Sequence, residues 1–99
     1  MSGILEQIKN TLAAHLPDLK KRYPIGRLTL FGSVTRKDFD PDRSDIDILV
    51  EFNGDIGWEF FDLHEELEKI LNRKVDLVSK RALKPHYLEH IKKDLVDVL

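Results

Sequence analysis

The chain of 99 residues has no cysteine, and methionine and tryptophan each occur once. Without cysteine there is no disulfide, no thiolate metal site and no thiol nucleophile, and a cytoplasmic location is the simplest interpretation. No apolar run approaches the roughly 20 residues that span a bilayer. Charged residues also interrupt the first 16 positions, where a signal peptide would need an apolar stretch. We therefore expect a protein that neither crosses nor binds a membrane.

A large excess of either charge is also missing. Sixteen Lys and Arg stand against 18 Asp and Glu, for a net charge of −2. A general nucleic-acid binder needs a basic face, so direct DNA binding is not expected. The basic runs at 20–22 and 80–84 are interpreted as solvated surface, with contact to a partner protein or RNA as the alternative. The length suits one domain, 1–99, with one modest core.

The apolar spacing predicts three helices and three strands. A proline at position 17 is expected to kink or restart the first helix, Asn72 to form a left-handed C-cap, and Pro85 to occupy the first turn of the last helix. The order of elements indicates an α/β fold in which helices cover a small sheet. The helices are expected at 2–16, with a further turn over 19–23, at 57–71 and from 85 onward; the strands at 27–31, 46–52 and 75–78; and a short helical turn at 34–38. Residues 96–99 form either a last helical turn or an edge strand.

Glycine is scarce too, and one of the five glycines precedes a serine at the end of a predicted strand. The pair Gly32-Ser33 directly follows the strand 27–31. Backbone N–H groups at a helix N-terminus bind phosphate, and glycine lets a ligand approach the backbone closely. Most Gly-Ser pairs are ordinary turns, so the pair alone is a weak indication of a phosphate site.

Two aspartates stand one residue apart at the start of the second strand. Residues i and i+2 of a strand share a face, so Asp45 and Asp47 project together, with Cα atoms about 7 Å apart. Like charges this close raise the free energy of the folded protein unless a cation lies between them. Mg²⁺ prefers oxygen ligands and takes one or two carboxylates besides water and substrate phosphates. The pair therefore predicts a Mg²⁺ site.

A third aspartate, Asp76, interrupts the third apolar strand, which we expect beside the second. A carboxylate buried there without a partner would be costly. Three carboxylates on neighbouring strands can hold two Mg²⁺ ions, and the third can accept the proton of an attacking hydroxyl. Taken singly, each has a simpler explanation: Asp45 and Asp47 as a solvated strand edge, and Asp76 as an ion-pair partner of Arg73 or Lys74.

Together these residues resemble the signature of the DNA polymerase β nucleotidyltransferase superfamily, and most closely its minimal nucleotidyltransferases. The likeness covers almost the whole chain, and the combined spacing of the motifs makes it specific. It implies a polymerase-β-like fold with a small mixed sheet, catalytic metals on the three aspartates, and the nucleotide triphosphate on the glycine-serine turn. Lys37 stands where the family usually has glycine. The matching motifs are Gly32-Ser33, Arg36, Ser44-Asp45-Ile46-Asp47 and Val75-Asp76-Leu77-Val78.

The resemblance also implies a function. Minimal members commonly form toxin–antitoxin pairs with HEPN-domain ribonucleases, and some transfer AMP from ATP to a tyrosine of the toxin. We therefore expect a Mg²⁺-dependent protein adenylyltransferase that uses ATP and two metal ions and acts as an antitoxin on a HEPN partner. The alternative is an antitoxin that blocks the ribonuclease by binding alone. Intact carboxylates favour catalysis, and the short length disfavours a third class, the antibiotic-type nucleotidyltransferases.

Two motif residues have competing roles. Arg36 is assigned to the nucleotide site, and an ion pair with Asp38, Asp42 or Asp45 is an equal alternative. Ser44 matches the nucleotide-site motif, but a hydroxyl that bonds the loop backbone is the stronger interpretation.

Several aromatic and histidine residues have no assigned place in this site. His86 and His90 are four apart on a predicted helix, where a solvated face is favoured over a metal site. Trp58, Phe60 and Phe61 cannot all face so small a core, so one is expected on a partner surface. Homo- and hetero-oligomers are both compatible with the sequence.

Overall fold

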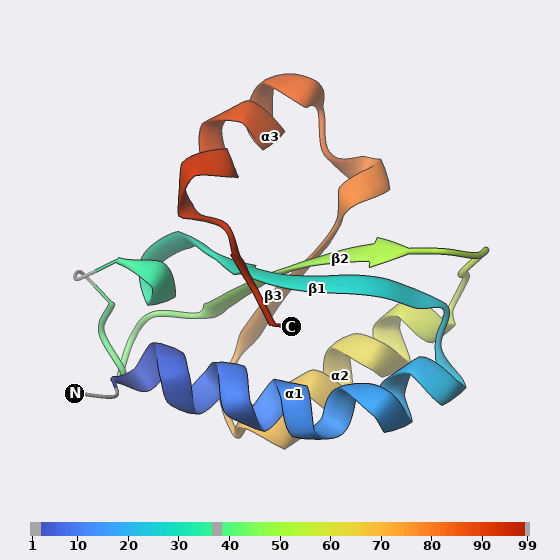
Figure 1. Cartoon of the computed structure of the whole chain (residues 1–99), viewed down its shortest axis with the longest axis horizontal. Helices are drawn as coiled ribbons and strands as arrows, with labels where there is room; N and C mark the ends of the chain where they lie inside the picture. Colours follow the sequence, from blue (N-terminus) through green and yellow to red (C-terminus); the bar gives the residue numbers. More distant parts are fainter. Residues whose placement is uncertain (1–2, 37–38, 99) are drawn as a thin grey trace.

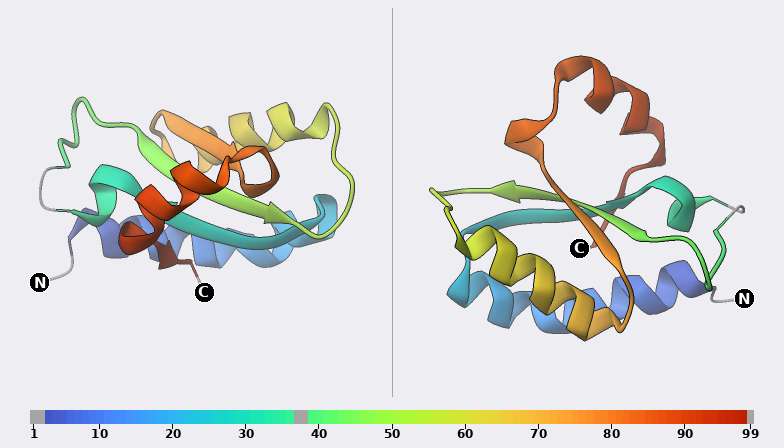
Figure 2. Two further views of the ribbon diagram at one scale, coloured as in Figure 1. Left: turned by 90° about the horizontal axis from the view of Figure 1, so that it is seen from above. Right: turned by 180° about the vertical axis from the view of Figure 1, so that it is seen from behind.

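The computed structural model describes residues 3–36 and 39–98. A four-stranded sheet carries two long helices on one face and a short helix on the other (Figures 1 and 2). Lys37 and Asp38, which the sequence analysis names beside the nucleotide-site motif, lie outside the described residues. The elements are α1 (Ile4–Arg22), β1 (Ile25–Phe31), η1 (Gly32–Thr35), β2 (Ile46–Phe52), α2 (Glu59–Leu71), β3 (Val75–Ser79), η2 (Lys80–Ala82), α3 (Pro85–Ile91), η3 (Lys92–Asp94) and β4 (Val96–Asp97), where η denotes a 3₁₀ turn.

The sheet is mixed, with strand order β3-β2-β1-β4. β1 pairs antiparallel with β2 and with β4, whereas β2 and β3 run parallel. A parallel pair needs a crossover connection, and α2 supplies it. The expected fold of a small mixed sheet covered by helices is therefore confirmed, and the chain ends in an edge strand rather than a last helical turn.

Alternation along the strands gives the sheet two different faces. One face packs on α1 and α2 and forms the main core, with buried residues such as Leu28, Leu30, Ile48 and Val50. The other face carries a small second cluster, which we call the α3 cluster, built on the buried side chains Phe31, Leu49 and Ile91. β2 is consequently buried on both faces, as its apolar run predicts.

α1 continues through Pro17, so the expected restart of the helix is wrong. Leu12, Leu16 and Leu19 are buried at helical spacing on both sides of the proline. Their packing holds the helix together although Pro17 lacks the N–H that a helix interior uses. α1 begins after Gly3, which occupies the N-cap position without a side-chain cap bond.

The other boundaries differ only slightly from the predictions. β1 begins at Ile25 rather than at 27, because Ile25 is buried and pairs with Phe52 ahead of an irregularity in the register. α2 begins at Glu59 rather than 57. Asn72 has the left-handed conformation (φ 52°) predicted for its C-cap, and Pro85 lies at the start of α3. In the described ranges 3–36 and 39–98 no helix has the length and apolar character to cross a membrane.

Candidate active site

The floor of the site is the junction between β1 and η1. Gly32 has φ +74°, a left-handed conformation that side chains disfavour. A Cβ atom on Gly32 would collide with Oδ2 of Asp47. The hydroxyl of Thr35 donates to the carbonyl of Gly32 (2.8 Å), and the Arg36 N–H donates to the carbonyl of Ser33 (3.0 Å), closing the turn. The helical turn thus begins at Gly32, two residues earlier than predicted.

Asp47 lies at the centre of the site. The register of β2 pairs its Cα with Phe31 of β1 on one side and with Asp76 of β3 on the other. Asp47 is half-buried, whereas Asp76 is exposed. The expectation that Asp76 is buried is wrong, because β3 is an edge strand whose outer face α3 covers only in part. Its exposure leaves this carboxylate accessible to a second molecule.

Asp45 stands one residue before β2 and is also exposed. It lines a cavity beyond the strand end with Arg73 and Lys74, apart from the cavity that Asp47 lines. Within the described residues, no group of three or more His, Asp or Glu side chains is arranged as a ready metal site. The structure therefore pairs Asp47 with Asp76 and leaves Asp45 on the rim.

The three carboxylates nevertheless interact. The pKa of Asp47 is raised to about 6, first by burial and then by the negative charges of Asp76 and Asp45, while Arg36 opposes the shift. A proton or a metal cation near Asp47 would relieve this unfavourable charge. The arrangement has the electrostatics of a cation site.

Arg36 forms an ion pair that the sequence analysis missed. Its Nη1 lies 2.8 Å from Oδ2 of Asp94 in η3, 58 positions further along the chain. The bridge ties the turn after β1 to the segment after α3. Ser44 bonds the loop backbone, as its structural interpretation predicts: its hydroxyl accepts from the Asp40 N–H (3.1 Å) and its N–H donates to the Asp40 carbonyl (2.8 Å).

A cavity of about 340 Å³, which we call the catalytic cavity, opens at this point. Gly32, Arg36 and Asp47 line it from the sheet side. The opposite wall comes from α3 and η3 and consists of Tyr87, His90, Ile91, Lys93 and Asp94. The sequence analysis assigned none of these residues to the site, although the spacing of 87, 90 and 93 puts them on one helical face.

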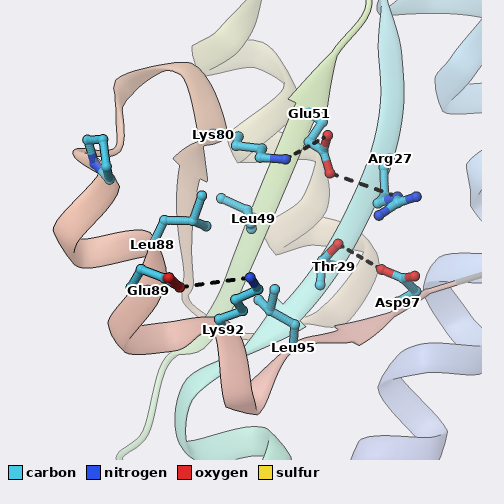
Figure 3. A pocket seen from close by; sticks show the side chains of 11 residues that line it. Arg27, Thr29, Leu49, Glu51, Lys80, Leu88, Glu89, Lys92, Leu95 and Asp97 are labelled. Atoms are coloured by element: carbon cyan, nitrogen blue, oxygen red, sulfur yellow. Dashed lines mark hydrogen bonds and ion pairs between the residues drawn. The ribbon is translucent and has the colours of Figure 1, made fainter.

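A second cavity of about 420 Å³ lies over the middle of the sheet, on the other side of α3 (Figure 3). We call it the central cavity. Leu49 and Leu88 line it together with charged residues that largely pair with one another. The pairs are Lys80 with Glu51 (3.3 Å), Arg27 with Glu51 (3.8 Å) and Lys92 with Glu89 (3.8 Å).

The three aromatic residues at the start of α2 do not all face the core, and two of them, rather than one, are exposed. Phe60 packs edge-on against Phe52 at the border of the core, whereas Trp58 and Phe61 are 83% and 59% exposed and lie against each other. An exposed aromatic pair of this kind is typical of a protein contact surface.

Known proteins share both the sequence and the fold. The family model described as nucleotidyltransferase domain matches residues 12–98. The protein adenylyltransferase MntA of Thermococcus cleftensis is 37% identical over 95 residues, covering 95% of each chain. The solved structure of a candidate minimal nucleotidyltransferase has a TM-score of 0.75 at 32% identity, covering 93% of each chain.

A more distant solved structure shares the fold alone, at 21% identity. It is a complex of a tri-AMPylated Shewanella oneidensis HEPN toxin with an MNT antitoxin. The match has a TM-score of 0.69 and covers 97% of this chain and 72% of that chain.

Proposed function

The chain belongs to the nucleotidyltransferase domain family, as a minimal nucleotidyltransferase, and from this premise we propose that it transfers AMP from ATP to a hydroxyl of a HEPN toxin. The T. cleftensis relative is a protein adenylyltransferase, and the S. oneidensis antitoxin is bound to an AMPylated toxin. A tyrosine is the proposed acceptor. The observation that carries the proposal is the contact between Gly32 and Asp47: without a side chain at 32, the Asp47 carboxylate lies directly against the glycine turn, so that a phosphate held by the turn would be next to a cation held by the carboxylate.

Magnesium fits the residues present. Asp45, Asp47 and Asp76 offer only oxygen donors, which Mg²⁺ prefers, and the pKa of Asp47 is raised by burial and by the neighbouring charges of Asp76 and Asp45. We assign these three aspartates as ligands of two Mg²⁺ ions. When bound, Mg²⁺ would neutralise charge that develops on the transferring phosphate.

The transfer is a displacement at the α-phosphorus of ATP. The acceptor oxygen forms a bond to phosphorus, the bond from phosphorus to the bridging oxygen breaks, and pyrophosphate leaves. The acceptor proton passes to Asp76, whose exposed position at the sheet edge is open to a macromolecule.

The remaining motif residues hold the nucleotide. Gly32 and Ser33 hold the phosphates, and the Ser33 hydroxyl is available because it makes no hydrogen bond to other described residues. Arg36 supports the phosphates from the same turn, and Ser44 shapes the loop that leads to Asp45.

The test is to incubate the chain with its HEPN partner, ATP and Mg²⁺, and to weigh the partner by mass spectrometry. We expect a mass gain of one or more AMP groups. Asp47→Ala should abolish the gain and leave the fold intact, since removing one carboxylate relieves repulsion. A partner of unchanged mass with the unaltered chain would exclude adenylyl transfer to that partner.

Blocking by binding alone is the second candidate, and one observation favours it. The exposed pair Trp58 and Phe61 lies at the start of α2 and suits a protein contact. Under this alternative, Trp58→Ala should abolish protection against the toxin, whereas Asp47→Ala should not. The adenylyl-transfer proposal predicts that protection is lost with Asp47→Ala.

A further inference from the structure

We propose that α3 and η3 form the second wall of the nucleotide site, where Lys93 holds the outer phosphates of ATP and Tyr87 stacks on the adenine. This inference rests on the proposed function, because it concerns ATP at the same site. It assigns a binding role to a helix that carries none of the motif residues.

The position of the helix supports this role. Tyr87 and Lys93 share one face of α3–η3 and line the catalytic cavity with Gly32 and Asp47. Ile91 lies between them and anchors the helix in the α3 cluster on the sheet. The wall is therefore held at a fixed place opposite the glycine turn.

The opposite face of the same helix turns away from the site. Leu88, Glu89 and Lys92 line the central cavity over Leu49, as Figure 3 shows. The helix thus divides the open face of the sheet into two cavities, and Asp47 lines the catalytic one. This division provides an internal comparison, because two adjacent lysines face different cavities.

Charge distinguishes the two lysines. Lys92 lies 3.8 Å from Glu89, whereas Lys93 has no carboxylate partner among residues 3–36 and 39–98. Arg36, on the other side of the catalytic cavity, is bound to Asp94. A polyphosphate in this cavity brings several negative charges, and Lys93 is a cation placed to pair with them.

Tyr87 supplies an aromatic surface. The side chain is 44% exposed although it lines a cavity wall. A base that stacks on such a ring gains binding energy that amounts to a factor of about ten in affinity. Stacking does not require the tyrosine hydroxyl, which separates it from a hydrogen-bonding role.

The experiment measures binding by titration calorimetry with Mg²⁺ and three probes: an ATP analogue with a methylene bridge between the α- and β-phosphates, AMP, and inorganic tripolyphosphate. Lys93→Met should weaken the analogue and tripolyphosphate about tenfold and leave AMP unchanged. Tyr87→Ala should weaken the analogue and AMP about tenfold and leave tripolyphosphate unchanged.

Two matched controls accompany these variants. Lys92→Met should bind all three probes like the unaltered chain, and Tyr87→Phe, which keeps the ring, should recover the affinity that Tyr87→Ala loses. Melting curves should show that every variant is folded. The inference is overturned if the unaltered chain does not bind the analogue, if Lys93→Met and Tyr87→Ala bind as tightly as the unaltered chain, or if Lys92→Met loses as much affinity as Lys93→Met.

The outcome is separable from that of the proposed function. If the variants lose affinity as expected but the HEPN partner is never modified, the inference about α3 and η3 is supported and the proposed transfer to that partner is wrong. If the partner is modified but the variants bind all probes normally, the binding roles of Lys93 and Tyr87 are wrong and the proposed transfer is supported.

Discussion

At the scale of single residues, the charge of Asp47 links the site to stability. Its pKa is raised from 3.8 to about 6 in the folded protein, chiefly by burial and then by Asp76 and Asp45. The folded state therefore holds this proton more tightly than the unfolded state. Above about pH 6 the carboxylate is charged in both states and destabilises the fold, and below about pH 4 this cost is absent.

We predict that Asp47→Asn stabilises the metal-free protein by about 1 kcal/mol near neutral pH, after allowance for solvent screening, and has little effect near pH 4. Urea denaturation of both proteins at these two pH values measures the difference. An equal difference at both values would contradict the assigned cause. Added Mg²⁺ should stabilise the unaltered chain more than the variant.

Gly32 provides a second prediction at this scale. Gly32→Ala combines a left-handed backbone, which costs about 1–2 kcal/mol for a residue with a side chain, with a collision against Asp47. A displaced Asp47 should reduce adenylyl transfer by about 100-fold. Gly57→Ala is the control, since the nearest atom to its added Cβ is Glu59 Oε1 at 3.6 Å. Rates from initial AMP incorporation measure both variants, and normal transfer by Gly32→Ala would count against the glycine floor.

Single residues also show which parts of the site could be predicted from the sequence. Asp47 and Asp76 could be predicted because each breaks an apolar strand pattern that is visible locally. The bond between Arg36 and Asp94 could not, because it joins segments 58 positions apart and depends on where α3 crosses the sheet. The place of Lys93 in the wall of the catalytic cavity could not be predicted for the same reason.

At the scale of elements, the predicted bounds of helices and strands were correct where buried apolar residues alone determine them. The bounds of β2 were predicted correctly, Ile46–Phe52, because a strand buried on both faces has a nearly continuous apolar run. The end of α1 was misjudged at Pro17, where packing of Leu16 and Leu19 outweighs the local cost of proline. Local propensity is thus a weaker guide than the apolar stripe that a helix presents to the core.

Pro17 yields a prediction about α1 as an element. Pro17→Ala should stabilise the protein by about 1–3 kcal/mol, because alanine restores the N–H bond to the preceding turn and removes a steric conflict. Pro85→Ala is the control and should have a small effect, since a proline at the start of α3 interrupts no helical bond. Urea midpoints of both variants provide the measurement. A loss of stability in Pro17→Ala would show that the helix depends on the proline.

At the scale of the whole molecule, the sheet is closed on one face and partly open on the other. α1 and α2 lie side by side on one face, whereas α3 is the one α-helix described on the other (Figure 1). The catalytic cavity is lined by α3 and η3 together with the end of β1 and Asp47. The three helices that cover the sheet could be predicted from the apolar periodicity of the sequence. The difference between the two faces of the sheet could not, because it depends on how α3 packs on Phe31 and Leu49. The open side is where an acceptor protein can reach Asp76.

This architecture gives a prediction about the outcome of an encounter with the toxin. If adenylyl transfer neutralises the toxin, the toxin should stay inactive after the two proteins are separated, since a phosphodiester does not dissociate. Asp76→Asn keeps the shape of the side chain but removes its charge, so that variant should fail to protect. The measurement is ribonuclease activity after separation. Activity that returns at the dissociation rate, together with full protection by Asp76→Asn, would favour blocking by binding.

The contact between Gly32 and Asp47 also constrains how the protein can evolve. Any side chain at position 32 brings a Cβ atom onto the Asp47 carboxylate, so no replacement at 32 fits while that carboxylate keeps its place. A mutation at 47 that relieved the collision by shortening the side chain would remove the proposed metal ligand. A first mutation at 32 is therefore expected to lower the proposed transfer, by about 100-fold for Gly32→Ala, and a shorter side chain at 47 would not restore it, so the effects of substitutions at the two positions should be coupled.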